Sequence, residues 1–171
     1  MVILRPTRRL STLLPPATTV PRRSDTALGD WYVNRIVVDH HPLLLLVSAS
    51  SLLPMLLPAR NVRELPRRLP DLVEARLRRC GIPGRSIEAE KKAMSSVTIG
   101  PTVDRSVPGI LVDFAKAVPC HLERGRWDDT TLQSIEAWLA ETPCCAGRRD
   151  DEVIFPDKKP PELLRARWEA G

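Results

Sequence analysis

The order of apolar and polar positions predicts a β-hairpin in the first third of the chain. Residues 31–38 are rich in β-branched and aromatic side chains, and residues 43–47 form a second, wholly apolar run. Residues 39–42, with the sequence Asp-His-His-Pro, separate the two runs and supply a turn. Because both runs are mostly apolar, we expect both strands to be largely buried and the hairpin to be central in its sheet.

Further along the chain the apolar period becomes helical. Between residues 62 and 80 apolar side chains recur on one face, and two prolines there predict a kinked or two-piece helix. The run at 48–57 predicts a short helix or an irregular apolar segment. Further helices are expected at residues 8–14, 83–94, 106–118, 128–139 and 160–168, and further strands at residues 3–5, 96–100 and 153–155.

These elements predict an α+β fold, in which helices pack on a small, mostly antiparallel sheet with the hairpin at its centre. A chain of 171 residues is long enough for one domain with a real core, so we expect a single domain over residues 1–171. Residues 15–27, rich in Pro, Thr and Arg, predict an exposed loop, and residues 143–159 predict a charged loop.

The chain is basic, with a formal net charge of +5 and a pI near 9.4. Four arginines lie away from the apolar side of the 62–80 helix, where they could follow a phosphate backbone: Arg60, Arg63, Arg67 and Arg78. Acidic residues alternate with them, so a solvated amphipathic helix is the alternative. No aromatic side chain accompanies these arginines to stack on bases.

The four cysteines have no C-x-x-C spacing, which predicts free thiols and a reducing, cytoplasmic location. The apolar run at residues 43–57 is shorter than the roughly 20 residues that a membrane span needs, so we expect buried core and no membrane partner. Asp39, His40 and His41 fit a hairpin turn better than a metal site. We predict neither a metal nor a cofactor.

The segment from Thr102 to Phe114 has the densest set of candidate site residues. Ser106 is expected to cap a helix, and a helix start attracts anions, so Arg105 beside it could hold a phosphate. Asp104 or Asp113 could then act as a base or a metal ligand. The alternative is structural, with Asp104 and Ser106 capping the helix while Arg105 makes a buried pair.

Three ordered stretches resemble an uncharacterised family of small bacterial proteins, known as a domain of unknown function. The segment from Ile99 to Ala115 resembles the family signature T-x-N-R-S-V-L-G-S-M-N-D-F-A-F, with Asp104, Pro108 and Val112 among the departures. Residues 28–35 resemble its L-G-D-W-Y-A-N-L strand, and residues 139–144 resemble its L-A-E-T-P-C stretch. The resemblance implies a family and supplies no activity.

Walker, Rossmann, zincin, nucleophile-elbow and EF-hand patterns are absent from the sequence, which removes the readily recognised enzyme classes. We therefore predict a small binding protein with a protein or nucleic-acid partner, for which a mobile-element or defence setting is one context. One alternative is an enzyme for a phosphorylated or nucleotide substrate that uses Arg105 with Asp104 or Asp113. Another is a structural subunit of a larger complex, with residues 43–57 as part of its interface.

Overall fold

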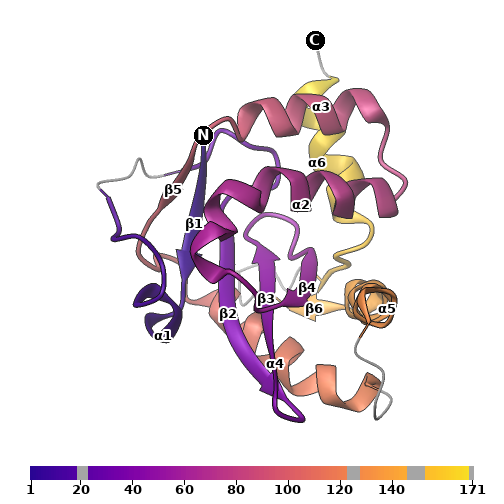
Figure 1. The fold of residues 1–171 in the computed structure, drawn as a ribbon. Coiled ribbons are helices and arrows are strands. Elements are labelled where there is room, and N and C mark those ends of the chain that lie inside the picture. The colour runs from indigo at the N-terminus through magenta and orange to yellow at the C-terminus, as the bar shows by residue number, and fades with distance from the viewer. Residues whose placement is uncertain (19–22, 123–127, 146–152, 170–171) are drawn as a thin grey trace.

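A mixed five-stranded sheet forms the middle of the molecule, with strand order β4-β3-β2-β1-β5 (Figure 1). The computed structural model describes residues 1–18, 23–122, 128–145 and 153–169, except the side chain at position 129. The strands are Val2–Pro6 (β1), Trp31–Val38 (β2), His41–Ser48 (β3), Pro54–Pro58 (β4) and Val97–Ile99 (β5). The β2-β3-β4 meander is antiparallel, whereas β1 runs parallel to β2 and β5. The predicted α+β fold with a central hairpin is confirmed, and the parallel pairings of β1 were not predicted.

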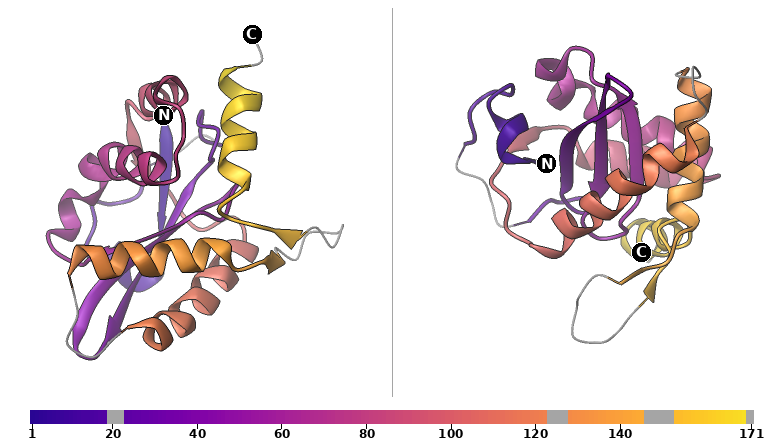
Figure 2. Two further views of the ribbon diagram at one scale, coloured as in Figure 1. Left: turned by 90° about the vertical axis from the view of Figure 1, so that its right-hand side faces the viewer. Right: turned by 90° about the horizontal axis from the view of Figure 1, so that it is seen from below.

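Helices cover both faces of this sheet and one of its edges (Figures 1 and 2). On one face, α2 and α3 pack against the sheet and α6 packs against α3; α4 covers the other face, and α5 runs beside β4. The helices are Arg8–Ser11 (α1), Val62–Glu64 (η1, a 3-10 turn), Leu65–Arg79 (α2), Gly84–Ala93 (α3), Ser106–His121 (α4), Asp129–Glu141 (α5) and Lys159–Trp168 (α6).

The alternation of side chains along the hairpin divides the core into two layers. Trp31 and Val33 of β2 point toward α2 and α3, together with apolar side chains from β3. Tyr32 lies between them in sequence and points to the opposite face, where it joins the layer under α4 and α5. Successive strand residues point to opposite faces of the sheet. A strand that is apolar at consecutive positions therefore contributes apolar side chains to both core layers.

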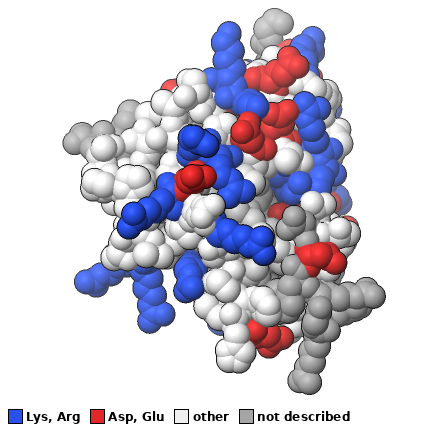
Figure 3. All heavy atoms as spheres, viewed as in Figure 1, with Lys and Arg blue, Asp and Glu red and all other residues white. Residues whose placement is uncertain are grey.

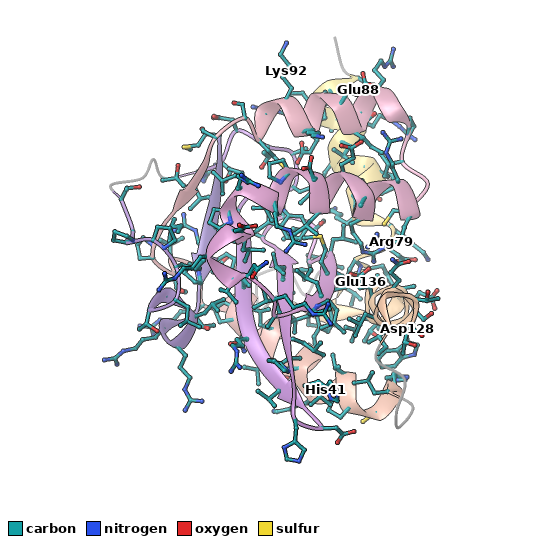
Figure 4. All side chains as sticks on the ribbon, viewed as in Figure 1. His41, Arg79, Glu88, Lys92, Asp128 and Glu136 are labelled. Carbon is teal, nitrogen blue, oxygen red and sulfur yellow. The ribbon has the colours of Figure 1, made fainter. Side chains whose placement is uncertain are left out.

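The hairpin turn contains two residues rather than the predicted four. Val38 pairs with His41, which leaves Asp39 and His40 in the turn, with φ angles of 46° and 66°. Two consecutive residues with positive φ form the type I′ turn, whose twist matches that of the flanking strands. The side chain of His41 lies at the exposed end of the hairpin (Figure 4).

Residues 48–57 do not form the expected short helix or irregular segment. The chain turns at residues 49–51 and returns as β4, which pairs with β3 in antiparallel register. The buried hydroxyl groups of Ser48 and Ser51, 2.5 Å apart, hold this turn closed, and Leu52 takes a φ of 58°. All of Leu43 to Val47 is buried, as is Leu52 to Leu56.

The backbone groups on the outer edge of β4 form hydrogen bonds with side chains of α2 and α5. Pro54 and Pro58 have no N–H to offer, and between them the N–H of Leu56 donates to Glu136 of α5 at 2.8 Å. The carbonyl of Pro54 accepts from Nε of Arg76 in α2 at 3.0 Å. Glu136 is only 2% exposed, and Arg79 also points toward it, with 2.8 Å between their charged groups (Figure 4).

The predicted helix at residues 62–80 is present as η1 followed directly by α2. Pro66 lies in the first turn of α2, where its missing N–H costs no hydrogen bond, and only Pro70 lies inside the helix. Gly81, with a φ of 70°, follows the C-cap of α2. Ser86 lies inside α3, where it is buried and donates a hydrogen bond to Glu169.

The two predicted loops are more structured than their composition suggests. Residues 15–18 are exposed, as expected, but Thr26 is buried and Ser24 is half-buried. Residues 144–145 and 153–154 form a short antiparallel pair, β6 and β7, within the predicted charged loop. Other parts of the two loops, at 19–22 and 146–152, lie outside the described residues.

Among the described glycines, Gly29 combines a positive φ with a close neighbour. Its φ is 74°, and a Cβ placed on it would lie 2.5 Å from Oγ of Ser50. We expect Gly29→Ala to lower the free energy of unfolding by about 1–2 kcal/mol, because an L side chain is strained in the left-handed region. Urea denaturation measures this change. The control is Gly109→Ala in α4, where a Cβ meets nothing within 4 Å and higher helix propensity should stabilise the fold by up to about 1 kcal/mol.

Candidate functional site

A cavity of about 520 Å³, called here the Tyr32 cavity, lies where four segments meet. These segments are residues 23–30, the start of β2, the turn between β3 and β4, and the connection from β5 to α4. Its lining is mostly polar: Arg23, Ser24, Thr26, Gly29, Asp30, Tyr32, Ala49, Ser50, Val103 and Asp104. Two of the stretches on which the family resemblance rests, around Asp30 and around Asp104, therefore meet at one place.

A buried ion pair joins Asp30, in the wall of the cavity, to Arg5 of β1. Arg5 is 1% exposed, and its Nε donates to Oδ2 of Asp30 at 2.5 Å. A second guanidinium nitrogen donates to the carbonyl of Pro101, just after β5. The other oxygen of Asp30 accepts from the backbone N–H of Ser24 at 3.2 Å and from its hydroxyl at 2.6 Å. The charge of Asp30 is thus neutralised, and both its oxygens are occupied.

Tyr32 faces the cavity from the strand next to Arg5, with which it pairs across β1 and β2. Its hydroxyl oxygen accepts from the backbone N–H of Asp104 at 3.1 Å. Burial raises the pKa of Tyr32 above 10.0, so the phenol keeps its proton at neutral pH. Among the residues described here, no acceptor receives that proton, which leaves it available to a ligand.

The cavity segment at residues 23–30 is held in place by a buried carboxylate of α3. Glu90 is 1% exposed and accepts from the N–H groups of Ala27 at 2.9 Å and Leu28 at 3.0 Å. The indole N–H of Trp168 in α6 donates to the same carboxylate at 2.8 Å. Three N–H donors satisfy this carboxylate and fix the chain next to the cavity.

The predicted site residues at the start of α4 do not form one site. Asp104 lines the Tyr32 cavity, and its Oδ1 accepts from the N–H of Ser106 at 2.8 Å and from its hydroxyl at 2.6 Å. Ser106 is the first residue of α4 rather than its N-cap, so Asp104 supplies the capping oxygen. Arg105 is exposed, and Asp113 is exposed two turns further along α4. The expected alternative of a buried pair at Arg105 is wrong for that reason.

Asp113 lines a second cavity, of about 310 Å³, between α4, the end of α5 and β6. Cys144 and Cys145 lie on its other side. Burial, and to a smaller extent the nearby carboxylate of Asp113, raises the pKa of Cys144 to about 11. A thiol with so high a pKa is a weak nucleophile at neutral pH, so this cavity offers no activated cysteine.

The predicted binding arginines fall into two groups. Arg60, Arg63 and Arg67 are exposed, and none of them makes an ion pair with another described residue. Arg78, by contrast, bonds to Glu74 one turn earlier, at 2.7 Å. The structure therefore separates three unpaired arginines at the start of α2 from one that is already engaged near its end.

Three further exposed arginines extend the unpaired group. Arg8 and Arg9 belong to α1, and Arg35 lies on β2 on the same face as Val33, toward α2. Leu13, two residues after α1, lines a hollow together with η1, so α1 and η1 adjoin. Figure 3 shows Lys and Arg side chains gathered over this side of the molecule. We call this set the arginine face: Arg8, Arg9, Arg35, Arg60, Arg63 and Arg67.

Sequence reasoning missed Arg5, Asp30 and Tyr32 as site residues. A signal for Arg5 was available, since a charged residue inside an apolar strand must find a partner when the strand is buried. The positions that meet around Tyr32 are spread over some 80 residues of sequence, and no periodicity links them. The hairpin-turn interpretation of Asp39 and His40 is confirmed.

We expect Asp30→Asn to destabilise the fold by about 3–5 kcal/mol, because it leaves the buried guanidinium of Arg5 without a counter-charge. Urea denaturation measures the loss, and the double variant Arg5→Met with Asp30→Asn should recover part of it. Glu162→Gln, which breaks the exposed pair with Lys159, is the control and should cost at most about 1 kcal/mol. Equal costs for Asp30→Asn and Glu162→Gln would contradict the assigned role of the buried pair.

We also expect the four free thiols to differ in reactivity. Cys120 and Cys145 are exposed and should react first with iodoacetamide at pH 7.5. Cys80 should react more slowly, since burial raises its pKa, and Cys144 should be about 100-fold less reactive than an ordinary thiol, because its pKa lies about two pH units higher. Peptide mapping after timed alkylation measures the order. In urea all four should react alike, and fast native labelling of Cys144 would be the contrary result.

Comparison with curated proteins gives no match, and comparison with solved structures gives none either. Among the described residues, no helix is long and apolar enough to cross a membrane, and no group of three or more His, Cys, Asp or Glu side chains could hold a metal ion. A family model described as "Domain of unknown function (DUF6933)" matches residues 3–159, which include the sheet, the Tyr32 cavity and the arginine face. The chain therefore belongs to this family of uncharacterised domains.

Proposed function

We propose that this protein is a nucleic-acid-binding protein that holds a duplex against its arginine face. The observation that carries the proposal is the set of six exposed arginines without an ion-pair partner among the described residues. An exposed arginine gains little from a surface ion pair within its own chain, whereas a row of phosphates offers it bidentate acceptors and releases counterions.

The arrangement of acidic residues supports the same proposal. Carboxylates near the end of α2 are engaged with neighbouring cations, as in the contacts of Glu74 with Arg78 and Lys91. In η1, Glu64 is the acidic residue among the arginines of the face, and it is exposed. The net charge over α1, η1 and the first turn of α2 is positive, which complements a polyanion and speeds its association.

A duplex is favoured over a single strand because the arginine face lacks aromatic platforms. The large exposed aromatic side chains of the described residues are Trp138 in α5 and Phe155 just after β7, not in α1, β2, η1 or α2. Single-strand binding depends largely on bases that stack on such rings, whereas duplex binding needs contacts to the phosphate backbone. We therefore propose that the protein binds the phosphate backbone of a duplex without regard to base sequence.

The alternative functions have less support. An enzyme that combines Arg105, Asp104 and Asp113 would need side chains that converge, and these three point to different places. A structural subunit that uses residues 43–57 as an interface would need that run to be exposed, but most of it is buried. Free thiols fit a reducing, cytoplasmic location, and a mobile-element or defence setting remains a context for the proposal.

The test is fluorescence anisotropy with a labelled 20-base-pair DNA duplex and with a single strand of the same length, from 50 to 300 mM salt. We expect duplex binding whose affinity falls steeply with salt. Replacing Arg60, Arg63 and Arg67 by Ala should reduce the slope of log affinity against log salt by about 3, because each lost phosphate contact contributes about 0.9.

A charge-matched control separates this face from net charge alone. Arg78, Arg165 and Arg167 are exposed but lie outside the arginine face, so their replacement by Ala removes the same charge. If both triple variants lose affinity equally, the face is not the binding site. Absence of salt-dependent binding by the unaltered protein would end the proposal.

A further inference from the structure

We propose that the Tyr32 cavity is a separate binding site for a small hydrophilic anion, namely a polyhydroxy compound that carries a phosphate or a carboxylate group. This inference does not depend on nucleic-acid binding, because the cavity shares no lining residue with the arginine face. It rests on three properties of the cavity: its volume, the groups that are already occupied, and the groups that remain open.

The volume and lining of the cavity suit a polar metabolite. About 520 Å³ is within the range of pockets that hold small ligands and exceeds what a few ordered waters need. Ligand pockets are usually lined by apolar and aromatic side chains, but among the described lining residues only Ala49 and Val103 are aliphatic. A ligand that fits must therefore present hydrogen-bonding groups over most of its surface.

The acceptors in the wall are largely occupied by the protein itself. Both oxygens of Asp30 are bonded, to Arg5 on one side and to Ser24 on the other. The Oδ1 atom of Asp104 accepts twice from Ser106. The hydroxyl of Thr26 donates to the carbonyl of Gly29 at 3.0 Å. Because these carboxylates already accept hydrogen bonds from the protein, they attract a cationic ligand less strongly.

The groups that remain open are mainly donors. Tyr32 is 1% exposed, and its hydroxyl proton has no acceptor in the described part of the chain. The hydroxyl of Ser50 likewise makes no hydrogen bond there, and the exposed guanidinium of Arg23 has no ion-pair partner there. A buried hydroxyl donor, a second hydroxyl and a cation at the mouth together select a ligand with acceptors and a negative charge.

The walls that present these groups are fixed before a ligand arrives. Glu90 holds the backbone at Ala27 and Leu28, and the N–H of Ala49 donates to the carbonyl of Asp30 at 2.7 Å. A pocket with preset donors loses less conformational entropy on binding than one that must order its loops. The cavity therefore has the rigid support that a recognition site requires.

The experiment uses Tyr32 as its own reporter, since it is the single tyrosine of the chain. Protein labelled with 13C at tyrosine Cζ gives one resonance, which is followed during titration with glucose 6-phosphate, gluconate, glucose and inorganic phosphate, each to 20 mM. We expect a saturable shift with glucose 6-phosphate or gluconate, and weaker binding of glucose and of phosphate alone. The first two probes distinguish a phosphate from a carboxylate ligand.

Two variants test the assigned contacts. Arg23→Ala should reduce the preference for the charged probe over glucose by about tenfold, which is the loss expected for one charge-assisted bond at an exposed site. Ser50→Ala should lower the affinity for the bound probe by up to about tenfold, and it leaves the Tyr32 reporter in place. Arg85→Ala, an exposed arginine of α3 outside the cavity, should change neither value. No saturable shift with any of the four probes, or an equal effect of Arg23→Ala and Arg85→Ala, would overturn the proposal.

Discussion

The buried pair of Arg5 and Asp30 is the interaction on which the arrangement of this molecule depends. Arg5 lies on β1, the strand that joins the antiparallel meander to β5, and its guanidinium also bonds the carbonyl of Pro101. Asp30 ends the long connection from β1, directly before β2, and it accepts hydrogen bonds from Ser24 as well. Two charges taken out of water must satisfy each other closely, so they fix the relative positions of three chain segments. The Tyr32 cavity lies beside this pair, and Asp30 is part of its lining.

Two other buried carboxylates also join separate elements, Glu90 through neutral donors and Glu136 through a backbone N–H and an arginine. Glu90 accepts from backbone N–H groups near β2 and from the indole of Trp168, which joins α3, α6 and the cavity wall. Glu136 accepts from Leu56 and contacts Arg79, which joins α5, β4 and α2. Such hydrogen bonds are directional, so they fix the orientation of a helix relative to the sheet. Burial of aliphatic side chains stabilises the contact in proportion to the buried area but does not fix its orientation. In a core with few aromatic rings, these hydrogen bonds specify how the helices are oriented on the sheet.

The elements that depend on local sequence patterns were predicted correctly. Residues 31–47 form the expected hairpin, and α2 and α5 follow their apolar periods, with Asp128 as the N-cap of α5. β4 was missed because a short apolar run bounded by prolines is compatible with strand, helix or loop until its partner strand is known. The Tyr32 cavity was missed because its residues come from four segments that only the fold brings together. Asp104 was found because capping is local. Arg105 and Asp113 were grouped with it by proximity in sequence, but Arg105 is exposed and Asp113 lies two turns along α4, at another cavity.

The edge of β4 has a consequence for how this protein can associate. A free strand edge lets a sheet continue into another molecule, by added strands or by stacking of copies into fibres. Along this edge, two prolines lack the donor, the donor between them is taken by Glu136, and the carbonyl of Pro54 is taken by Arg76. At the opposite side of the sheet, β5 is only three residues long. The sheet is thus closed to growth on its longer edge, and a partner that binds there must recognise side chains rather than backbone.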